Sequence, residues 1–215
     1  MLHPLGRGEH HPASRTSSKA IALSYGPRAL RIPSMASIPT HSLIGWLIGR
    51  AWALGPRSAR FHFYSLACAA LPDLDVIGFP LGIRYEDALG HRGFSHSLCF
   101  AVLVGVAVGA WVGRHSPRSL AFWGLALHFT AVTASHAVLD MMTDGGLGVA
   151  FWSPFDLTRY FLPWRPLVVS PIGVTRFLSE WGWRVVQSEA LYAIVPALFL
   201  SYAVRAVLRR ARAQR

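Results

Sequence analysis

The histidines and aspartates that could perform chemistry in this chain gather in four short stretches, each at the end of an apolar run. They are Thr40-His41, Leu71-Pro72-Asp73-Leu74-Asp75, the phrase GHRGFSHS at 90–97, and Ser135-His136-Ala137-Val138-Leu139-Asp140. Histidine and carboxylate ligands without thiolates suit zinc, manganese or iron. We therefore predict that the four stretches close on one divalent metal site.

The clearest pair is His136 and Asp140, four residues apart at the end of a predicted helix. This spacing puts both side chains on one face, one turn apart, where they can chelate a cation. Such pairs also arise by chance or as capping contacts. Asp144 follows where the helix should end, either as a group that supports the ligands or as a helix terminator. His128, two turns deeper, is interpreted as a hydrogen-bonded core histidine.

Asp73 and Asp75 flank Leu74 just after Pro72. In an extended segment, residues two apart point the same way, and two neighbouring carboxylates repel each other unless a cation intervenes. At an apolar boundary that cost rises. The alternative is a solvated Pro-Asp turn. We favour the metal interpretation, with one carboxylate as a ligand and the other free to act as a general base.

His91 and His96 are five residues apart and separated by Gly93, so a turn should bring them together. Ser95 is expected to N-cap the apolar run that follows. Arg92 has a planar fork that suits phosphate or carboxylate, and it is predicted to bind an anionic substrate group, with Ser97 as a second substrate-binding residue.

The complete prediction is a hydrolytic metal centre. Its metal ligands are His41, Asp73, Asp75, His91, His96, His136 and Asp140. Its catalytic residues are Asp73, Asp75 and Arg92. Such a site can lower the pKa of bound water to about 7 and supply a hydroxide nucleophile. The sequence contains neither a Gly-x-Ser-x-Gly elbow nor a His-Glu-x-x-His helix.

The elements that must position these residues are membrane helices. The 215 residues are 53% hydrophobic and 14% charged, whereas soluble domains carry about 25% charged residues. We predict an all-α, polytopic helical membrane protein of about four to five apolar helices, with the metal site at one membrane face. The apolar runs are 42–54, 61–71, 98–113, 120–139 and 190–204. Pro72 should stop the second run, and 145–188 should be a long connection whose aromatic residues lie at the membrane interface.

The basic residues predict a sidedness. Arg57, Arg60, Arg114, Arg118 and the C-terminal arginines alternate along the chain with the four motif stretches. By the positive-inside tendency they mark the cytoplasmic face, which puts the metal site on the periplasmic side. The formal charge of +11 does not form one patch interleaved with aromatics, so no nucleic-acid binding is expected. Cys68 and Cys99 lie in apolar runs and are interpreted as packed thiols.

Three segments follow from this pattern. Residues 1–34 are expected to be a disordered basic extension, with Met35 as a candidate translation start. Residues 35–208 form the helical membrane domain, and 209–215 form a basic C-terminal tail. Every motif lies downstream of Met35, so the chain from that residue should suffice for membrane insertion and metal binding.

The motifs resemble those of the YdjM family of bacterial inner-membrane proteins. The resemblance rests on Thr40-His41, the LPDLD phrase at 71–75, HRGFSHS at 91–97, His136 and Asp140 followed by Thr143 and Gly145, Trp152-Ser153-Pro154-Phe155 and Arg159-Tyr160-Phe161. It implies a multi-pass, metal-dependent hydrolase of the inner membrane that contacts the lipid bilayer, most simply with zinc. A distant similarity to the zinc phospholipase C group implies a phosphoester or lipid-linked substrate.

Two rival interpretations stay open. Ser135-His136 and Asp140 faintly resemble the last motif of the type 2 phosphatidic acid phosphatases, which need no metal, although the Pro-Ser-Gly-His element of that group is missing here. The other rival is a non-enzymatic membrane protein whose metal is structural or transported. A structural site should be coordinatively closed.

Overall fold

The computed structural model describes residues 34–52, 58–113, 117–171 and 174–214. Apart from Ser34, the predicted basic extension lies outside these residues, as do Arg57 and Arg114. The regular secondary structure of the described part is helical except for two antiparallel strands of two residues each, β1 (Ser34–Met35) and β2 (Ser170–Pro171). The predicted all-α class is therefore confirmed.

The described helices follow the apolar runs. They are α2 (Ile38–Ala51), α3 (Ala59–Ala70), η2 (Leu71–Leu81), η3 (Phe94–His96), α4 (Leu98–Gly113), α5 (Leu120–Met141), α6 (Val174–Phe177), α7 (Glu180–Glu189), η4 (Ala190–Ile194) and α8 (Val195–Ala213). Three helical stretches within the described ranges are long and apolar enough to cross a membrane, namely Ala59–Leu81, Leu120–Met141 and Glu180–Ala213, and α4 is a shorter apolar helix. These four stretches agree with the predicted polytopic architecture.

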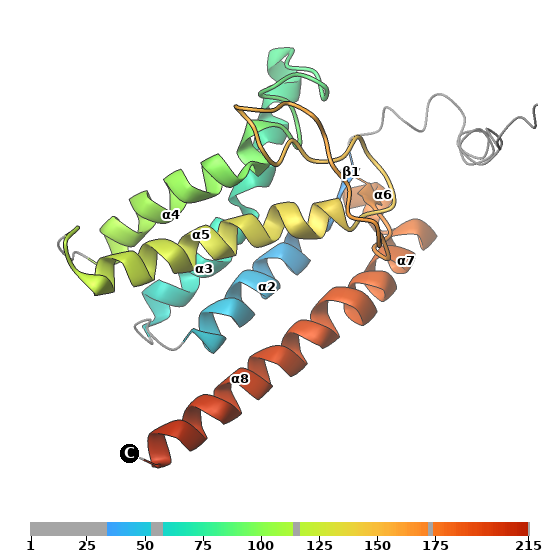
Figure 1. Cartoon of the computed structure of the whole chain (residues 1–215). Helices are drawn as coiled ribbons and strands as arrows, with labels where there is room; N and C mark the ends of the chain where they lie inside the picture. The colour runs from blue at the N-terminus through green and yellow to red at the C-terminus, as the bar shows by residue number, and fades with distance from the viewer. Residues whose placement is uncertain (1–33, 53–57, 114–116, 172–173, 215) are drawn as a thin grey trace, which may run out of the picture. The chain divides into compact units, whose positions relative to one another are not determined.

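Small residues line the contact between α4 and α5. Helices α4 and α5 lie side by side, α2 and α3 pack on α5, and α8 packs on α2 (Figure 1). The buried residues of α4 are Ala101, Gly105 and Gly109, one every four residues. A side chain at Gly105 would lie 2.6 Å from the carbonyl oxygen of Ala126 on α5. This small face lets the two backbones approach closely, as is common between membrane helices.

The second apolar run does not stop at Pro72, and that prediction was wrong. Helix α3 passes directly into η2, a helix of the 3₁₀ type that begins at Leu71. Proline is tolerated there because the first turn of a helix has no partner for its backbone N–H. The extended segment expected for Asp73 and Asp75 was wrong for the same reason. With three residues per turn, side chains two apart point in different directions.

The last helix is longer than the predicted 190–204. It begins at Glu180, contains the single π-type turn η4, and continues to Ala213. Residues 209–213 of the predicted tail therefore belong to α8. The predicted connection 145–188 likewise holds two helices, α6 and α7, in addition to its loops. Pro196 lies in the first turn of α8, just after η4, and its missing N–H is accommodated where the helix changes its hydrogen-bond pattern.

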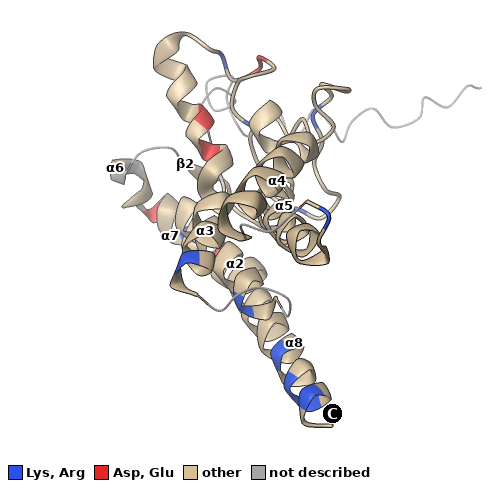
Figure 2. Ribbon diagram, turned by 90° about the vertical axis from the view of Figure 1, so that its left-hand side faces the viewer, with Lys and Arg blue, Asp and Glu red and all other residues tan. Residues whose placement is uncertain are grey.

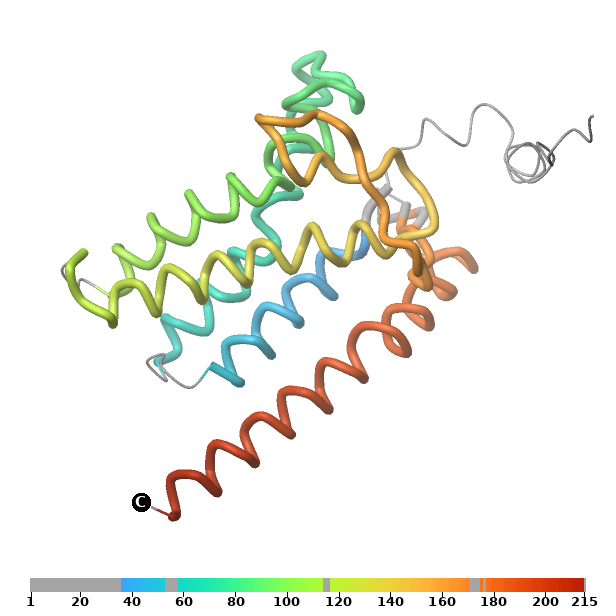
Figure 3. Tube along the Cα trace, in the orientation of Figure 1, coloured from blue at the N-terminus to red at the C-terminus, as the bar shows by residue number. Residues whose placement is uncertain are grey.

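All motif stretches meet at one end of the helices. The segments 71–97 and 142–170 lie together at the end where α2 begins and α5 ends (Figure 3). Arginine residues instead gather along the C-terminal part of α8 (Figure 2). Arg50 lies in the last turn of α2, and Arg60 lies at the start of α3. The arginines at these helix ends thus lie away from the motifs, but Arg92 and Arg159 lie at the motif end, so the separation is incomplete and the sidedness stays a prediction.

Candidate metal centre

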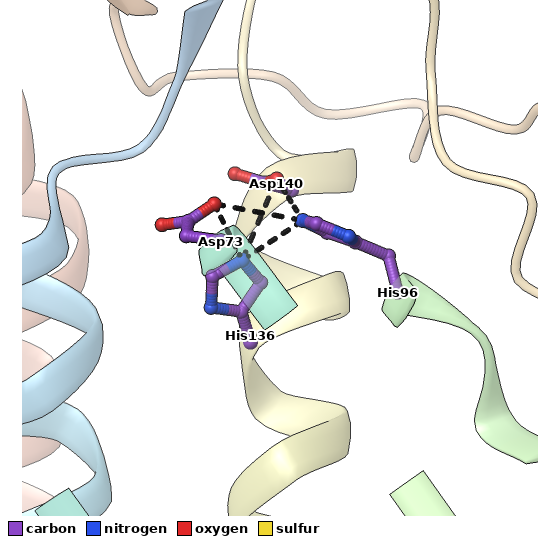
Figure 4. A group of neighbouring side chains, drawn as sticks. All are labelled: Asp73, His96, His136 and Asp140. Atoms are coloured by element: carbon purple, nitrogen blue, oxygen red, sulfur yellow. Dashed lines mark hydrogen bonds and ion pairs between the residues drawn. The ribbon is translucent and has the colours of Figure 1, made fainter. Parts of the chain in front are cut away.

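Four buried side chains bring one ligand atom each to within 4.8 Å of one another: Asp73, His96, His136 and Asp140. They come from η2, η3 and α5 and point toward one another (Figure 4). His136 Nε2 lies 3.0 Å from His96 Nε2 and 3.3 Å from Asp73 Oδ1. Asp140 Oδ2 lies 3.4 Å from His96 Nε2 and 3.8 Å from His136 Nε2. Ligand atoms around a tetrahedral zinc lie roughly 3.3 Å apart, so the donor set fits such an ion.

The hydrogen bonds of the two imidazoles direct their lone pairs inward. His136 Nδ1 lies 2.7 Å from the carbonyl oxygen of Ala69, which only accepts, so Nδ1 carries the proton and Nε2 carries the lone pair. His96 Nδ1 lies 3.2 Å from Asp75 Oδ2, which assigns its proton in the same way. Two lone pairs and two carboxylates then face one another in a buried space. A cation satisfies that arrangement.

Asp75 and His91 form a second group that shares His96. Asp75 Oδ1 lies 2.7 Å from His91 Nδ1, and Asp75 Oδ2 accepts a 2.6 Å hydrogen bond from the Ser95 hydroxyl. The three side chains Asp75, His91 and His96 also bring ligand atoms within 4.8 Å of one another. Asp75 thus uses both of its oxygens to orient the histidines, as carboxylates behind metal-ligating histidines commonly do.

Asp140 is anchored on several sides. Its Oδ1 accepts a 2.9 Å hydrogen bond from the backbone N–H of Ala36, just before α2. Its Oδ2 lies 3.0 Å from Arg92 Nε. His41, in the first turns of α2, stacks on His136 at 3.6 Å between ring centroids, and its Nε2 lies 3.6 Å from Asp140 Oδ1. The predicted ligand His41 thus borders the group of four, and neither of its ring nitrogens has a hydrogen-bond partner among the described residues.

The two predicted substrate-binding residues are both buried. Ser97 caps α4, because its hydroxyl oxygen accepts a 3.0 Å hydrogen bond from the Phe100 N–H, so the cap predicted at Ser95 was wrong. Arg92 is fully buried and has a φ of 61°. That left-handed conformation is uncommon for a residue with a side chain and is held here by the contacts of the guanidinium. The substrate-binding roles of Arg92 and Ser97 stay predictions.

The electrostatics of the group favour a positive charge at its centre. Burial lowers the pKa of the His96 imidazole, while hydrogen bonds to three carboxylates raise it. The carboxylates prevail, so the pKa of His96 lies well above its usual value. Acidic side chains that hold a proton on a buried imidazole in this way provide an equally favourable environment for a metal ion.

Two other titratable residues have ordinary structural roles. His128 is buried, with Nε2 2.8 Å from the Ser65 hydroxyl, and it stacks on Phe61. It is the hydrogen-bonded core histidine that the sequence predicted. Asp144 is exposed, and its Oδ1 accepts a 2.8 Å hydrogen bond from the Val169 N–H. It ties the end of α5 to the following loop and does not join the ligand group.

Sequence reasoning missed three residues that build the site. Glu189 is buried at the end of α7 and accepts hydrogen bonds of 2.6 Å from the Ser37 N–H and 2.8 Å from the Thr40 hydroxyl, next to His41. Arg159 donates to the carbonyl oxygens of His91 and Tyr85. Tyr85 packs its ring edge to face with His91. Arg159 was present in the sequence only as part of the Arg159-Tyr160-Phe161 phrase of the family resemblance, and no pattern singled out Glu189.

The fold and the buried cluster define a class: multi-pass α-helical membrane proteins with a histidine–aspartate site that could hold a metal ion at one end of the bundle. The chain belongs to the YdjM inner membrane protein family, whose model matches residues 35–212. It is similar to the inner membrane protein YbcI of Escherichia coli (strain K12), with 33% identity over 168 residues, which is 77% of this chain and 95% of that protein. No solved structure shows significant similarity. Family and helices together indicate a multi-pass location in the inner membrane.

Proposed function

We propose that this protein is a membrane-bound, metal-dependent hydrolase that acts on a phosphoester or lipid-linked substrate. The observation that carries the proposal is the facing pair of imidazole nitrogens, His136 Nε2 and His96 Nε2, only 3.0 Å apart and bordered by two buried carboxylates. Without a metal ion or a proton between the two nitrogens, this arrangement leaves lone pairs and negative charges opposed in a buried site. Zinc suits the donor set best, and manganese and iron share it.

The residues divide the work of such a centre. Asp73, His96, His136 and Asp140 would hold the ion, and when bound it would lower the pKa of a water ligand to about 7. Asp75 keeps the His96 proton on Nδ1, and the Ala69 carbonyl does the same for His136. Asp73 Oδ2 is a buried carboxylate oxygen without a hydrogen-bond partner among the described residues. It is therefore the better placed of Asp73 and Asp75 to accept a proton from water.

The number of ligands supports a second candidate. Four protein ligands close a zinc site, and closed sites are usually structural. The role of Asp140 distinguishes the hydrolase from the structural site. Its contacts to Arg92 and to the Ala36 N–H would hold this carboxylate in the same position even if it did not bind the metal. A site of Asp73, His96 and His136 would leave an open position for water, as hydrolysis requires.

Metal analysis and an ester panel test both candidates. Detergent-purified full chain should contain a divalent metal, hydrolyse at least one of a set of phosphomonoesters, phosphodiesters and carboxylic esters, lose that activity with EDTA and regain it with zinc. Activity that survives EDTA and is lost with vanadate would favour the metal-independent phosphatase. Retained metal without turnover of any ester would favour the structural site.

Substitution of the ligands tests the site itself. His136→Ala and Asp140→Asn should lose bound metal, while the core variant His128→Ala should retain it. If His136→Ala protein bound metal at the wild-type stoichiometry, the proposed centre would not exist, whereas metal retained by Asp140→Asn alone would leave Asp140 off the metal, as the open site requires.

A further inference from the structure

The Arg92 guanidinium has a donor that the protein does not use. Its Nε lies 3.0 Å from Asp140 Oδ2, and its Nη1 donates a 3.1 Å hydrogen bond to the Gly145 carbonyl oxygen. Its Nη2 is buried and has no hydrogen-bond partner among the described residues. A buried N–H of a charged group is costly to leave unpaired. The guanidinium is therefore set to bind one further acceptor.

A second unused donor lies beside it. The Tyr85 hydroxyl is buried and also lacks a hydrogen-bond partner among the described residues. A phenol carries its proton at neutral pH and can donate. Its ring packs edge to face on His91 at 5.2 Å between centroids, which fixes the direction of the hydroxyl.

The two groups converge on Gly146. This glycine has a φ of +87°, and a side-chain carbon there would lie 2.8 Å from Arg92 Nη1 and 3.0 Å from the Tyr85 hydroxyl oxygen. The guanidinium group, through Nη1, and the phenol oxygen therefore both adjoin Gly146, where only glycine leaves room for them. Since Arg92 also contacts Asp140, this place adjoins the metal centre.

The surroundings favour an anion with more than one negative charge. Arg159 lies over the Tyr85 ring at 5.5 Å and donates a 2.8 Å hydrogen bond to the Tyr85 carbonyl oxygen. It adds a second guanidinium to the segment. The flanking residues Arg84 and Glu86 are exposed, and Tyr85 itself is only half-buried. The segment thus lies between the solvent and the site.

We propose that Tyr85 and Arg92 form an anion-binding pair that holds a phosphoryl oxygen of the substrate beside the metal centre. The inference rests on the proposed hydrolase function and narrows its substrate class to phosphoesters. The phenol and the guanidinium group come from different segments and both adjoin Gly146, so each can donate to a separate oxygen of one phosphoryl group. Charge-assisted hydrogen bonds of this kind are about twice as strong as neutral ones.

Phosphate binding to the zinc-loaded full chain in detergent tests the pair. Inorganic phosphate and phosphatidic acid in mixed micelles are titrated by calorimetry against wild type, Tyr85→Phe, Arg92→Lys and Tyr160→Phe. Tyr160 is the matched control because its hydroxyl donates to the Asp156 carboxylate, on the loop away from the ligand group. Zinc content is measured for every variant, so that a missing metal centre is distinguished from a missing anion site.

Tyr85→Phe should bind a full equivalent of zinc yet bind phosphate about tenfold more weakly or worse, the usual effect of losing one hydrogen bond to a charged group. Arg92→Lys should weaken phosphate binding at least as much, because the single ammonium group of lysine cannot replace both the Nε and the Nη2 donors of arginine. Tyr160→Phe should match the wild type. A preference for phosphatidic acid with the same Tyr85 dependence would support the pair and identify a lipid headgroup as the source of the phosphoryl group.

Three results would overturn the inference. They are zinc-loaded wild type that binds neither probe, Tyr85→Phe that binds both with wild-type affinity, and Tyr160→Phe that is weakened as much as Tyr85→Phe. Each of these can occur with the metal centre intact, and the proposed hydrolase function would then stand without this anion site.

Discussion

Replacement of Asp75 by asparagine tests whether Asp75 binds the metal itself or orients the histidines that bind it. Asp75 Oδ1 faces His91 Nδ1 at 2.7 Å, and Oδ2 faces His96 Nδ1 at 3.2 Å. Asparagine has one acceptor oxygen in place of two. If that oxygen keeps the shorter bond to His91, the amide NH₂ faces the Nδ1–H of His96. The opposed donors favour the tautomer of His96 with its proton on Nε2, the atom that should hold the metal.

The expected effect is a weaker site that is still present. Loss of a carboxylate that orients a metal-ligating histidine typically lowers metal affinity 10- to 100-fold, or about 1.4 to 2.7 kcal/mol. Asp75→Asn should therefore bind one equivalent of zinc at saturation, with the dissociation constant raised by that factor. Asp73→Asn, which removes a member of the group of four, should fail to reach one equivalent.

Zinc competition with a chromophoric chelator measures both quantities. Asp144→Asn is the matched control, because it makes the same charge change at an exposed carboxylate whose partner is the Val169 N–H, and it should keep wild-type affinity. If Asp75→Asn lost zinc as completely as Asp73→Asn, Asp75 would itself be a ligand. If its affinity stayed within about twofold of wild type, the orienting role would be refuted.

Three further predictions follow from the packing and the helix ends. His128→Ala should keep bound metal but lower the free energy of unfolding by roughly 2–4 kcal/mol, since a buried ring stacked on Phe61 is lost; thermal unfolding in detergent measures this, and an unchanged midpoint would contradict it. Glu189→Gln should lower the free energy of unfolding by about 1–3 kcal/mol. The two oxygens of Glu189 accept hydrogen bonds from Ser37 and Thr40, whereas an amide has only one acceptor oxygen. Glu180→Gln, at an exposed position, is the control. In a Cys99→Ser chain, Leu157→Cys should react with an impermeant maleimide from the periplasm and Leu120→Cys only after permeabilisation, and the reverse pattern would invert the proposed topology. Gly146 is unsuited to that labelling because a side chain there would collide with Arg92.

The sequence alone determined the class and most of the site membership. Scarce acids and histidines at the ends of apolar runs are costly near lipid, so their clustering was readable without coordinates. The spacing of His136 and Asp140 placed both on one helix face, and the two side chains do join one group. The helix bounds of the uncharged run Leu98–Gly113 also followed from composition, because such a run has one stable backbone arrangement in a bilayer.

The roles within the site depended on tertiary structure. Whether Asp73 and Asp75 point together or apart depends on the backbone after Pro72, and the 3₁₀ geometry sends Asp73 to the group of four and Asp75 to the far side of His96. Periodicity could not decide this, because a short segment next to a proline is compatible with either backbone. Glu189 and Tyr85 carried no pattern, and Arg159 entered only through the family resemblance, without a role. Their roles exist only because the chain brings residues far apart in sequence into contact, as when Glu189 meets Ser37 at the start of α2.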